Sequence, residues 1–247
     1  MDVKPLTPGA DGPQSAAAGT ARAAPGPGSR YRIIVTNEVD EYEEGATAIG
    51  TLDFAFAARA AGDDFEGTAR RAAKLSIARA DIEEFSDLRE LIEALTPDED
   101  MVRRKPRIST GARSGRVAEE RRNVRVRAFL YAASREDDND FHLIIGRHPD
   151  DTPEMYMTME LSGLPPKRSA SFRQLNAARD AYKAFFGDNL PGFAYEFPDP
   201  PVPVEIEGSL FFDMSHAQGI RPGPKSLKSR MPTIWEVHPI TRIVFEP

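Results

Sequence analysis

Five stretches in the second half of the chain alternate apolar and polar residues with a period of two. They are Asn123–Tyr131, Phe141–Gly146, Met155–Leu161, Val202–Phe212 and Ile234–Phe245. Alternation of this kind puts one set of side chains on a buried face and the other on the opposite face, so each stretch predicts a strand. Between the third and fourth, Ala170–Phe186 carries apolar residues at helical spacing and predicts one amphipathic helix.

The order of these elements predicts the fold. Five strands with a single helix between the third and the fourth are typical of the oligonucleotide/oligosaccharide-binding (OB) barrel. We therefore expect a mainly β protein with some α, whose residues 121–247 form a five-stranded OB-like barrel. The apolar stripe of the helix is expected to close the bottom of the barrel, and Gly208 is expected to let the fourth strand coil tightly.

The rest of the chain divides by composition into three segments. Residues 1–29 are rich in Pro, Gly and Ala without the continuous apolar core of a signal peptide, which predicts a disordered leader. Residues 30–100 predict a small region that is either α+β or helical. We expect this region to be an α-helical addition to the barrel. Residues 101–120 are polar and basic and predict a linker.

Within the N-terminal region the pattern predicts one strand and two helices. The β-branched run Arg32–Thr36 predicts the strand. Phe65–Ala80 predicts a helix from its Ala, Arg and Lys content. Asp81, with Glu84 three residues later, predicts the capped start of a second helix that ends before Pro97.

Composition narrows the class of protein. A charged fraction of 29% and the absence of an apolar run of about 20 residues indicate a chain without a membrane span. The chain has no cysteine, which excludes disulfides, zinc–thiolate sites and iron–sulfur clusters. We expect a cytoplasmic protein without a cofactor.

Clustered cations favour nucleic acid as a ligand, although the net charge is −7. Ten Arg and Lys residues lie between 103 and 127, opposed by Glu119 and Glu120. OB folds bind single strands with a cationic groove and exposed aromatic rings. The candidate residues come from the first strand, the third strand and the loop after the fourth: Arg125, Arg127, Phe129, Tyr131, Tyr156, Arg221, Lys225, Lys228 and Arg230. The alternative is that the acidic N-terminal helices pair with and mask these cations.

Three motifs carry a resemblance to a known family. Asp140-Phe-His-Leu-Ile144, Gly208-Ser-Leu-Phe-Phe-Asp213 followed by His216, and Trp235-Glu-Val-His-Pro239 together resemble a poorly characterised family of bacterial OB-like domains. The resemblance covers roughly residues 121–247. It implies a small β-barrel protein, often secreted in that family, and carries no activity.

The same motifs contain a second set of candidate residues. His142, His216 and His238 occur with Asp213 and Glu236, and imidazole with carboxylate can bind a metal or transfer protons. One alternative is therefore a metal-dependent phosphodiester hydrolase that uses Asp213, His216, Glu236 and His238, with the three histidines as metal ligands. The other interpretation is that these side chains only hydrogen-bond at the barrel rim. Antiparallel pairing of the last two strands is expected to place Asp213 near the start of the fifth strand, not beside His238.

A third possibility is a protein-interaction module, because exposed aromatic and Arg side chains also mark protein interfaces. The fold alone does not choose among these functions. The sequence favours a non-catalytic binding protein, with single-stranded DNA or RNA as the expected partner and a protein as the alternative.

Overall fold

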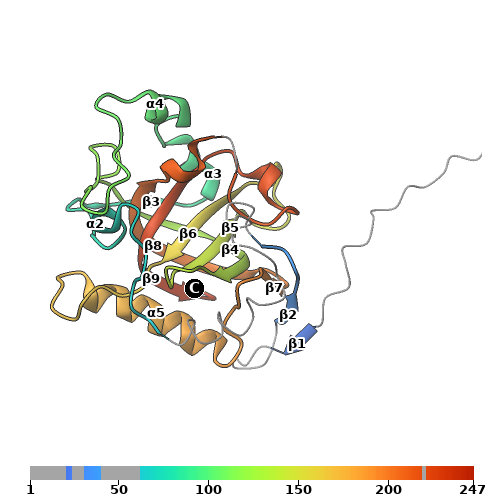
Figure 1. Cartoon of the computed structure of the whole chain (residues 1–247). Helices are drawn as coiled ribbons and strands as arrows, with labels where there is room; N and C mark the ends of the chain where they lie inside the picture. The colour runs from blue at the N-terminus through green and yellow to red at the C-terminus, as the bar shows by residue number, and fades with distance from the viewer. Residues whose placement is uncertain (1–20, 24–30, 40–61, 219–220) are drawn as a thin grey trace, which may run out of the picture.

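The computed structural model describes residues 21–23, 31–39, 62–218 and 221–247. Nearly all of the leader expected over residues 1–29 lies outside the described residues. In the part that is described, the chain is mainly β, with strands that wrap into a closed barrel and a few helices around it (Figure 1).

Five strands close the barrel, as the sequence predicted. They are β4 (Asn123–Arg135), β5 (Phe141–Gly146), β6 (Tyr156–Leu161), β8 (Val202–Phe212) and β9 (Trp235–Phe245). Antiparallel pairing joins β4 to β5, β5 to β6, β9 to β8 and β8 back to β4. The circle is completed by β6 and β9, which pair in parallel. This parallel pair matters for the site, because it brings the third and fifth barrel strands side by side.

Helix α5 (Phe172–Phe186) closes one end of the barrel, at the bottom of Figure 1. Its apolar stripe packs on barrel aromatics, as predicted. The ring of Phe185 stacks on that of Phe245 at 4.1 Å, and the ring of Tyr182 lies 4.9 Å from that of Phe141. The opposite end is filled by Trp235, which is 1% exposed and donates its indole N–H to the carbonyl oxygen of Thr96 at 2.8 Å.

Three short strands extend the sheet beside β4. Strand β7 (Glu196–Asp199) pairs with β2 (Arg32–Val35), and β2 pairs with β1 (Ala21–Ala23). The strand predicted over Arg32–Thr36 is thus confirmed.

The two helices predicted over Phe65–Ala80 and from Asp81 to the residue before Pro97 form only in part. Only α2 (Arg71–Lys74) is helical in the first of them, because Phe65 donates its N–H to Leu164 and Arg70 adopts a left-handed φ of 48° directly before α2. The segment expected to begin the second helix is β3 (Ile82–Phe85), which pairs in parallel with β4. Pairing with an open strand edge supplies backbone hydrogen bonds that outweigh helix propensity, which is a weak preference.

Two further helices follow β3. Helix α3 (Leu88–Glu93) is capped by Asp87, whose carboxylate accepts the N–H of Arg89 at 2.8 Å, and not by the predicted pair Asp81 and Glu84. Helix α4 (Asp98–Arg103) begins after Pro97. Both lie at the end of the barrel opposite α5 (Figure 1).

Gly208 marks a bend in β8. The pairing of β8 with β9 shifts register on both sides of this residue. A Cβ at this position would lie 2.5 Å from the carbonyl oxygen of Pro239, so only glycine allows the two backbones to approach so closely.

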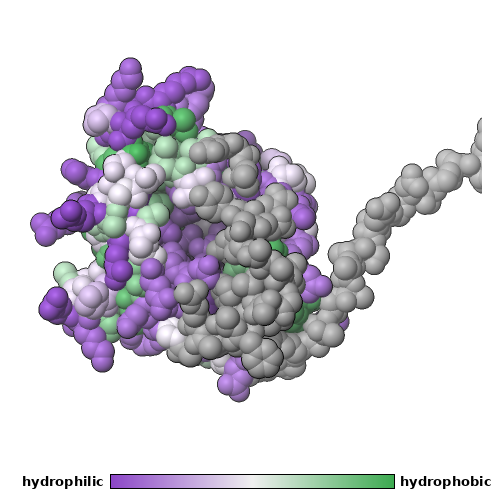
Figure 2. Space-filling view, in the orientation of Figure 1, coloured by the Kyte–Doolittle hydropathy of each residue, from purple (hydrophilic) through white to green (hydrophobic). Residues whose placement is uncertain are grey.

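The described surface is mostly hydrophilic on the side shown in Figure 2, with small hydrophobic areas between the charged residues. Among the described helices, none combines the length and apolar character required to cross a bilayer.

Candidate metal centre

A polar cluster lies on the outer face of β5, β6 and β9. Along these strands the apolar residues point into the barrel, and the alternating residues between them point outward. The outward set contains His142 on β5, Thr158 and Glu160 on β6, and Glu236 and His238 on β9, each at most 3% exposed. Polar side chains so deeply buried on the outside of a barrel call for a specific partner.

Strand register aligns these side chains in a row. Antiparallel pairing of β5 with β6 sets His142 opposite Glu160. Parallel pairing of β6 with β9 sets Thr158 opposite Glu236, so that Glu160, two residues later, reaches His238. The carboxylate of Glu160 therefore has one imidazole on each side, that of His142 on β5 and that of His238 on β9.

Loops at the barrel rim complete the cluster. The turn between β4 and β5 supplies Glu136, Asp138 and Asp140, and the short helical segment η2 (Met214–Gln218) brings His216 beside Asp213. Lys74 comes from α2. The turn of α2 is tied to β9 by buried Arg116, whose guanidinium donates to the carbonyl oxygens of Ala73 (2.9 Å) and His238 (2.6 Å).

Three sets of metal-binding side chains occur among the described residues. In each set two carboxylates and one imidazole offer ligand atoms that all lie within 4.8 Å of one another. The sets are Glu136, His142 and Glu160; Asp140, Glu160 and His238; and Asp213, His216 and Glu236.

Short distances link the first two sets and connect them to the third. Glu160 Oε2 lies 2.7 Å from His238 Nδ1, and Glu160 Oε1 lies 4.0 Å from His142 Nδ1. His238 Nε2 is 3.4 Å from Asp140 Oδ2, and His238 Nδ1 is 3.5 Å from Glu236 Oε2. The carboxylates and imidazoles thus form one continuous group.

Several of these buried atoms have no hydrogen-bond partner among the described residues. They are Asp140 Oδ2, His142 Nε2, Thr158 Oγ1, Glu160 Oε2, both carboxylate oxygens of Glu236 and both ring nitrogens of His238. Although His238 Nδ1 and Glu160 Oε2 are only 2.7 Å apart, their alignment is not that of a hydrogen bond. Since buried polar atoms are nearly always paired, this concentration of unpaired atoms in one place points to a ligand that binds them.

Lys74 is a positive charge beside the cluster. Its Nζ lies 3.3 Å from Asp138, 3.8 Å from Asp140 and 3.9 Å from Glu160. Burial opposes its charged form, but the surrounding carboxylates, with Glu160 first, raise the pKa of Lys74 well above its usual value. Lys74 therefore stays protonated and offsets only part of the negative charge.

Burial disfavours charge on the carboxylates of the cluster. It raises the pKa of Asp140 and of Glu236 well above the usual range, with neighbouring carboxylates adding to the effect, and raises the pKa of Glu160 to about 7. Burial, helped by the charge of Lys74, lowers the pKa of His238 to about 3, so this imidazole is neutral. A metal site uses neutral imidazoles together with carboxylates that lose their protons when the cation binds, and this cluster offers both.

The donor types indicate which ions fit. Carboxylate oxygen with imidazole nitrogen suits Mn²⁺, Fe²⁺ and Zn²⁺. Structural zinc sites use four protein ligands, whereas catalytic sites keep a position open for water or substrate. Each of the sets found here offers three protein ligands.

All residues of the metal alternative lie in this cluster. Asp213, His216 and Glu236 form one set, and His238 and His142 belong to the other two. Asp213 lies near the start of β9, in the set with Glu236, as the sequence indicated.

The cluster also contains residues that sequence reasoning did not select as site residues. These are Lys74, Glu136, Asp138, Asp140 and Glu160. The sequence held one usable indication of them. Glu160 is a carboxylate near the end of a largely apolar strand, on the same side as Thr158. The strand order of an OB-like barrel places that strand beside the one with His238.

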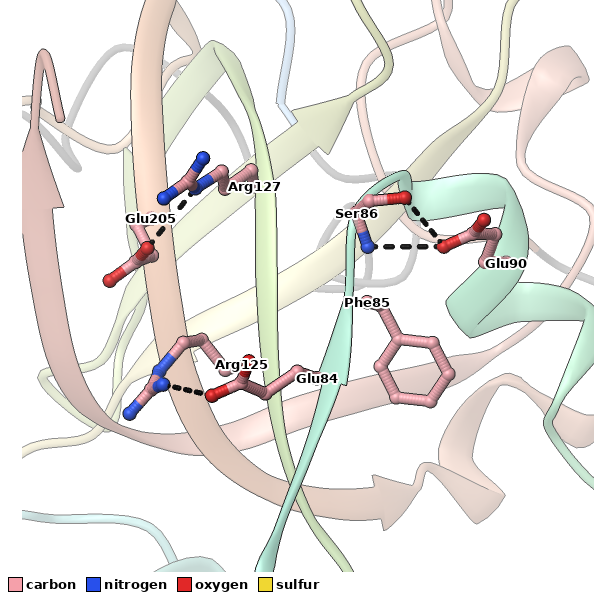
Figure 3. A pocket seen from close by; sticks show the side chains of 7 residues that line it. All are labelled: Glu84, Phe85, Ser86, Glu90, Arg125, Arg127 and Glu205. Atoms are coloured by element: carbon pink, nitrogen blue, oxygen red, sulfur yellow. Dashed lines mark hydrogen bonds and ion pairs between the residues drawn. The ribbon is translucent and has the colours of Figure 1, made fainter.

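The cations expected to bind nucleic acid on β4 are held in ion pairs. Figure 3 shows Arg125 directed at Glu84 and Arg127 directed at Glu205, and Arg125 also donates to Glu207 at 2.8 Å. Arg125, Arg127 and their partners Glu84 and Glu205 border an open pocket of about 460 Å³, and no residue of the metal sets lines that pocket.

The expected aromatic platform is also engaged within the protein. The Tyr131 hydroxyl donates to the carbonyl oxygen of Arg147 at 2.9 Å, and its ring meets that of Tyr156 edge-on at 4.9 Å. Tyr156 is 4% exposed. Phe129 packs edge-on against His148 at 4.9 Å.

The loop between β8 and β9 does not collect its cations at one place. Arg221 pairs with Asp98 at 3.1 Å, whereas Arg230 pairs with Glu154. Lys225 is exposed and Lys228 is half-buried.

Comparison with known proteins returned no relative: no family model, no curated protein and no solved structure matches the chain. The resemblance of residues 121–247 to bacterial OB-like domains therefore stays a prediction, and the site has to be interpreted from its own chemistry.

Proposed function

We propose that this protein is a metal-dependent phosphodiester hydrolase, with the cluster around Glu160 and His238 as its metal centre. The observation that carries the proposal is the set of buried carboxylate and imidazole atoms without hydrogen-bond partners among the described residues. The proposal departs from the expectation of a protein without a cofactor.

The position of the cluster supports this substrate class. In OB-type barrels the outer face of the second and third strands binds oligonucleotides and oligosaccharides. Here those strands are β5 and β6, which carry His142 and Glu160. A phosphodiester is the group in such ligands that binds divalent ions through its oxygens.

Hydrolysis at this centre would add one water across a P–O bond. A bound metal ion lowers the pKa of its water and supplies hydroxide at neutral pH. As the water oxygen bonds to phosphorus and the P–O bond to the leaving oxygen breaks, a carboxylate of the cluster would take up the proton released by the water and return it to the leaving oxygen, which would depart as an alcohol. Lys74 would offset negative charge that develops on the phosphoryl oxygens.

Non-catalytic binding of single strands through the face of β4 has less support. Ion pairs with Glu84, Glu205 and Glu207 already occupy Arg125 and Arg127. No specific feature of the described residues favours a role in binding another protein.

The test is hydrolysis by the full chain after removal of bound metal with a chelator. Mn²⁺, Mg²⁺ or Zn²⁺ is added back, with bis(p-nitrophenyl) phosphate and a labelled single-stranded oligonucleotide as substrates. We expect cleavage only with added metal, and a loss of about 100-fold or more in His238→Gln. His148→Gln is the matched control, because the side chain of His148 is 52% exposed and lies outside the cluster. Absence of cleavage with every metal would contradict the proposal.

A further inference from the structure

The two carboxylate oxygens of Glu160 face two different imidazoles. Oε1 lies 4.0 Å from Nδ1 of His142 on β5, and Oε2 lies 2.7 Å from Nδ1 of His238 on β9. Strand β6 runs between β5 and β9 and holds Glu160 in the middle. A carboxylate that presents one oxygen to each side is placed to bridge two cations.

Glu160 is also the residue that two of the ligand sets share. On the side of β5, Glu136 and His142 complete a set, and the carboxylate of Glu136 is hydrogen-bonded to His142 Nδ1. On the side of β9, Asp140 and His238 complete the other. Each side therefore has an imidazole and a second carboxylate of its own.

We propose that the metal centre is binuclear, with Glu160 as the carboxylate that bridges one ion held by Glu136 and His142 and another held by Asp140 and His238. The inference rests on the proposed function in one respect, namely that the cluster binds metal ions.

Burial and charge support two ions over one. Asp140, Glu160 and His238 are at most 3% exposed, and each has an atom without a hydrogen-bond partner in the described part of the chain. Lys74 Nζ lies within 4 Å of the carboxylates of Asp138, Asp140 and Glu160. When bound metal ionises the carboxylates of the two sets and that of Asp138, one divalent ion leaves a negative excess among them, whereas two ions remove it and leave the centre able to attract an anionic phosphodiester.

The third set is less dependent on an ion. Asp213 Oδ1 accepts the N–H of Ser215 at 2.8 Å, and Asp213 Oδ2 lies 3.5 Å from His216 Nε2. In addition, the charges of His216 and Lys74 outweigh burial and lower the pKa of Asp213.

The experiment counts Mn²⁺ ions bound to the chelator-treated full chain, by equilibrium dialysis with metal analysis. Glu160→Gln is expected to lower the number of bound ions by two, and Glu136→Gln and Asp140→Asn by one each. Asp150→Asn, at a side chain that is 93% exposed, is the carboxylate control and should leave the number unchanged. Electron paramagnetic resonance should show spin-coupled Mn²⁺ in the wild type and none in Glu160→Gln.

Folding is checked separately by circular dichroism and urea unfolding of each variant without metal. Gln has the shape of a protonated Glu, so Glu160→Gln should fold. If folded Glu160→Gln loses one ion or none, or if wild-type Mn²⁺ ions show no coupling, the bridge is refuted even where hydrolysis is observed. A coupled pair without any hydrolysis refutes the proposed function and keeps the bridge. Absence of Mn²⁺ binding to the wild type overturns both.

Discussion

Glu160 Oε2 and His238 Nδ1 lie 2.7 Å apart across the parallel pair β6–β9, without the alignment of a hydrogen bond. Both side chains are nearly inaccessible, at 3% and 0% exposure. An oxygen and a nitrogen that present lone pairs to each other at this distance repel. A proton or a metal ion between them removes that repulsion. This relationship connects the fold to the proposed chemistry, because it exists only where the third and fifth barrel strands meet.

The metal-free protein is expected to lose stability as the pH rises, through Glu160. Burial raises its pKa from 4.5 to about 7, so between these values the folded state keeps a proton that the unfolded state has released. The stabilisation is present below pH 4.5 and is lost as the pH rises through about 7. It amounts to at most about 3.5 kcal/mol, since one pKa unit corresponds to about 1.4 kcal/mol.

Urea unfolding with chelator at several pH values between 4.5 and 8 measures this, as the difference between wild type and Glu160→Gln. The difference removes contributions common to both proteins. The lowered pKa of His238 acts in the opposite sense and costs stability as the pH falls below 6.5, so the change with pH expected from Glu160 alone is the one between 6.5 and 8. A difference that does not change with pH would show that Glu160 is not held in its protonated form.

Added metal is expected to stabilise the folded chain. A ligand that binds only the folded state contributes about 2.7 kcal/mol at a free concentration of 100 times its Kd. For a chain of this length that corresponds to a rise in Tm of roughly 5 to 10 °C. Thermal unfolding with Mn²⁺ and then with excess chelator measures the shift. If Mn²⁺ raised the Tm of His238→Gln as much as that of the wild type, the bound ion would lie elsewhere.

Oligonucleotide binding should depend on the metal and not on the face of β4. Arg127 is paired with Glu205, and Tyr131 donates to a backbone carbonyl, so Arg127→Ala combined with Tyr131→Ala should change affinity by less than roughly twofold. Fluorescence anisotropy at low and high salt, with Mn²⁺ or with chelator, measures this. A large, salt-sensitive loss in the double variant would instead support the binding face that the sequence predicted.

The fold was largely predictable because each barrel strand carries a regular alternation. β5 and β8 begin and end where the pattern indicated, and Gly208 lies at a bend. Residues 65–95 were not predictable in the same way, since β3 forms only because β4 offers an open edge for parallel pairing. The intrinsic preferences of residues 82–85 do not reveal that β4 is their pairing partner.

The site was predictable in part. His142 and His238 stood out as polar residues in strands, but their closeness depends on Glu160 between them, and this follows from the parallel β6–β9 pair. Lys74 and Asp138 lie on loops and a short helix whose positions are fixed by tertiary contacts such as those of Arg116. The ion pairs of the β4 cations were not predictable for a related reason, because their acidic partners come from β3 and β8.

Gly208→Ala should destabilise the barrel by about 1–3 kcal/mol, because the added methyl group would lie 2.5 Å from the carbonyl oxygen of Pro239 and 2.4 Å from a methyl carbon of Val237. Gly115→Ala is the matched control, since a Cβ there has no described atom within 4 Å. Urea unfolding compares the two. Equal stability of both variants would mean that β8 and β9 can separate locally without cost.

The measurement that tests the account most directly is calorimetric titration of the chelator-treated full chain with Mn²⁺, alongside His238→Gln and His148→Gln. The account predicts saturable binding to the wild type and to His148→Gln, and diminished binding to His238→Gln, which lacks a ligand of one of the two ions. Absence of binding to the wild type, or undiminished binding to His238→Gln, would contradict the assignment of the cluster around Glu160 and His238 as a metal centre.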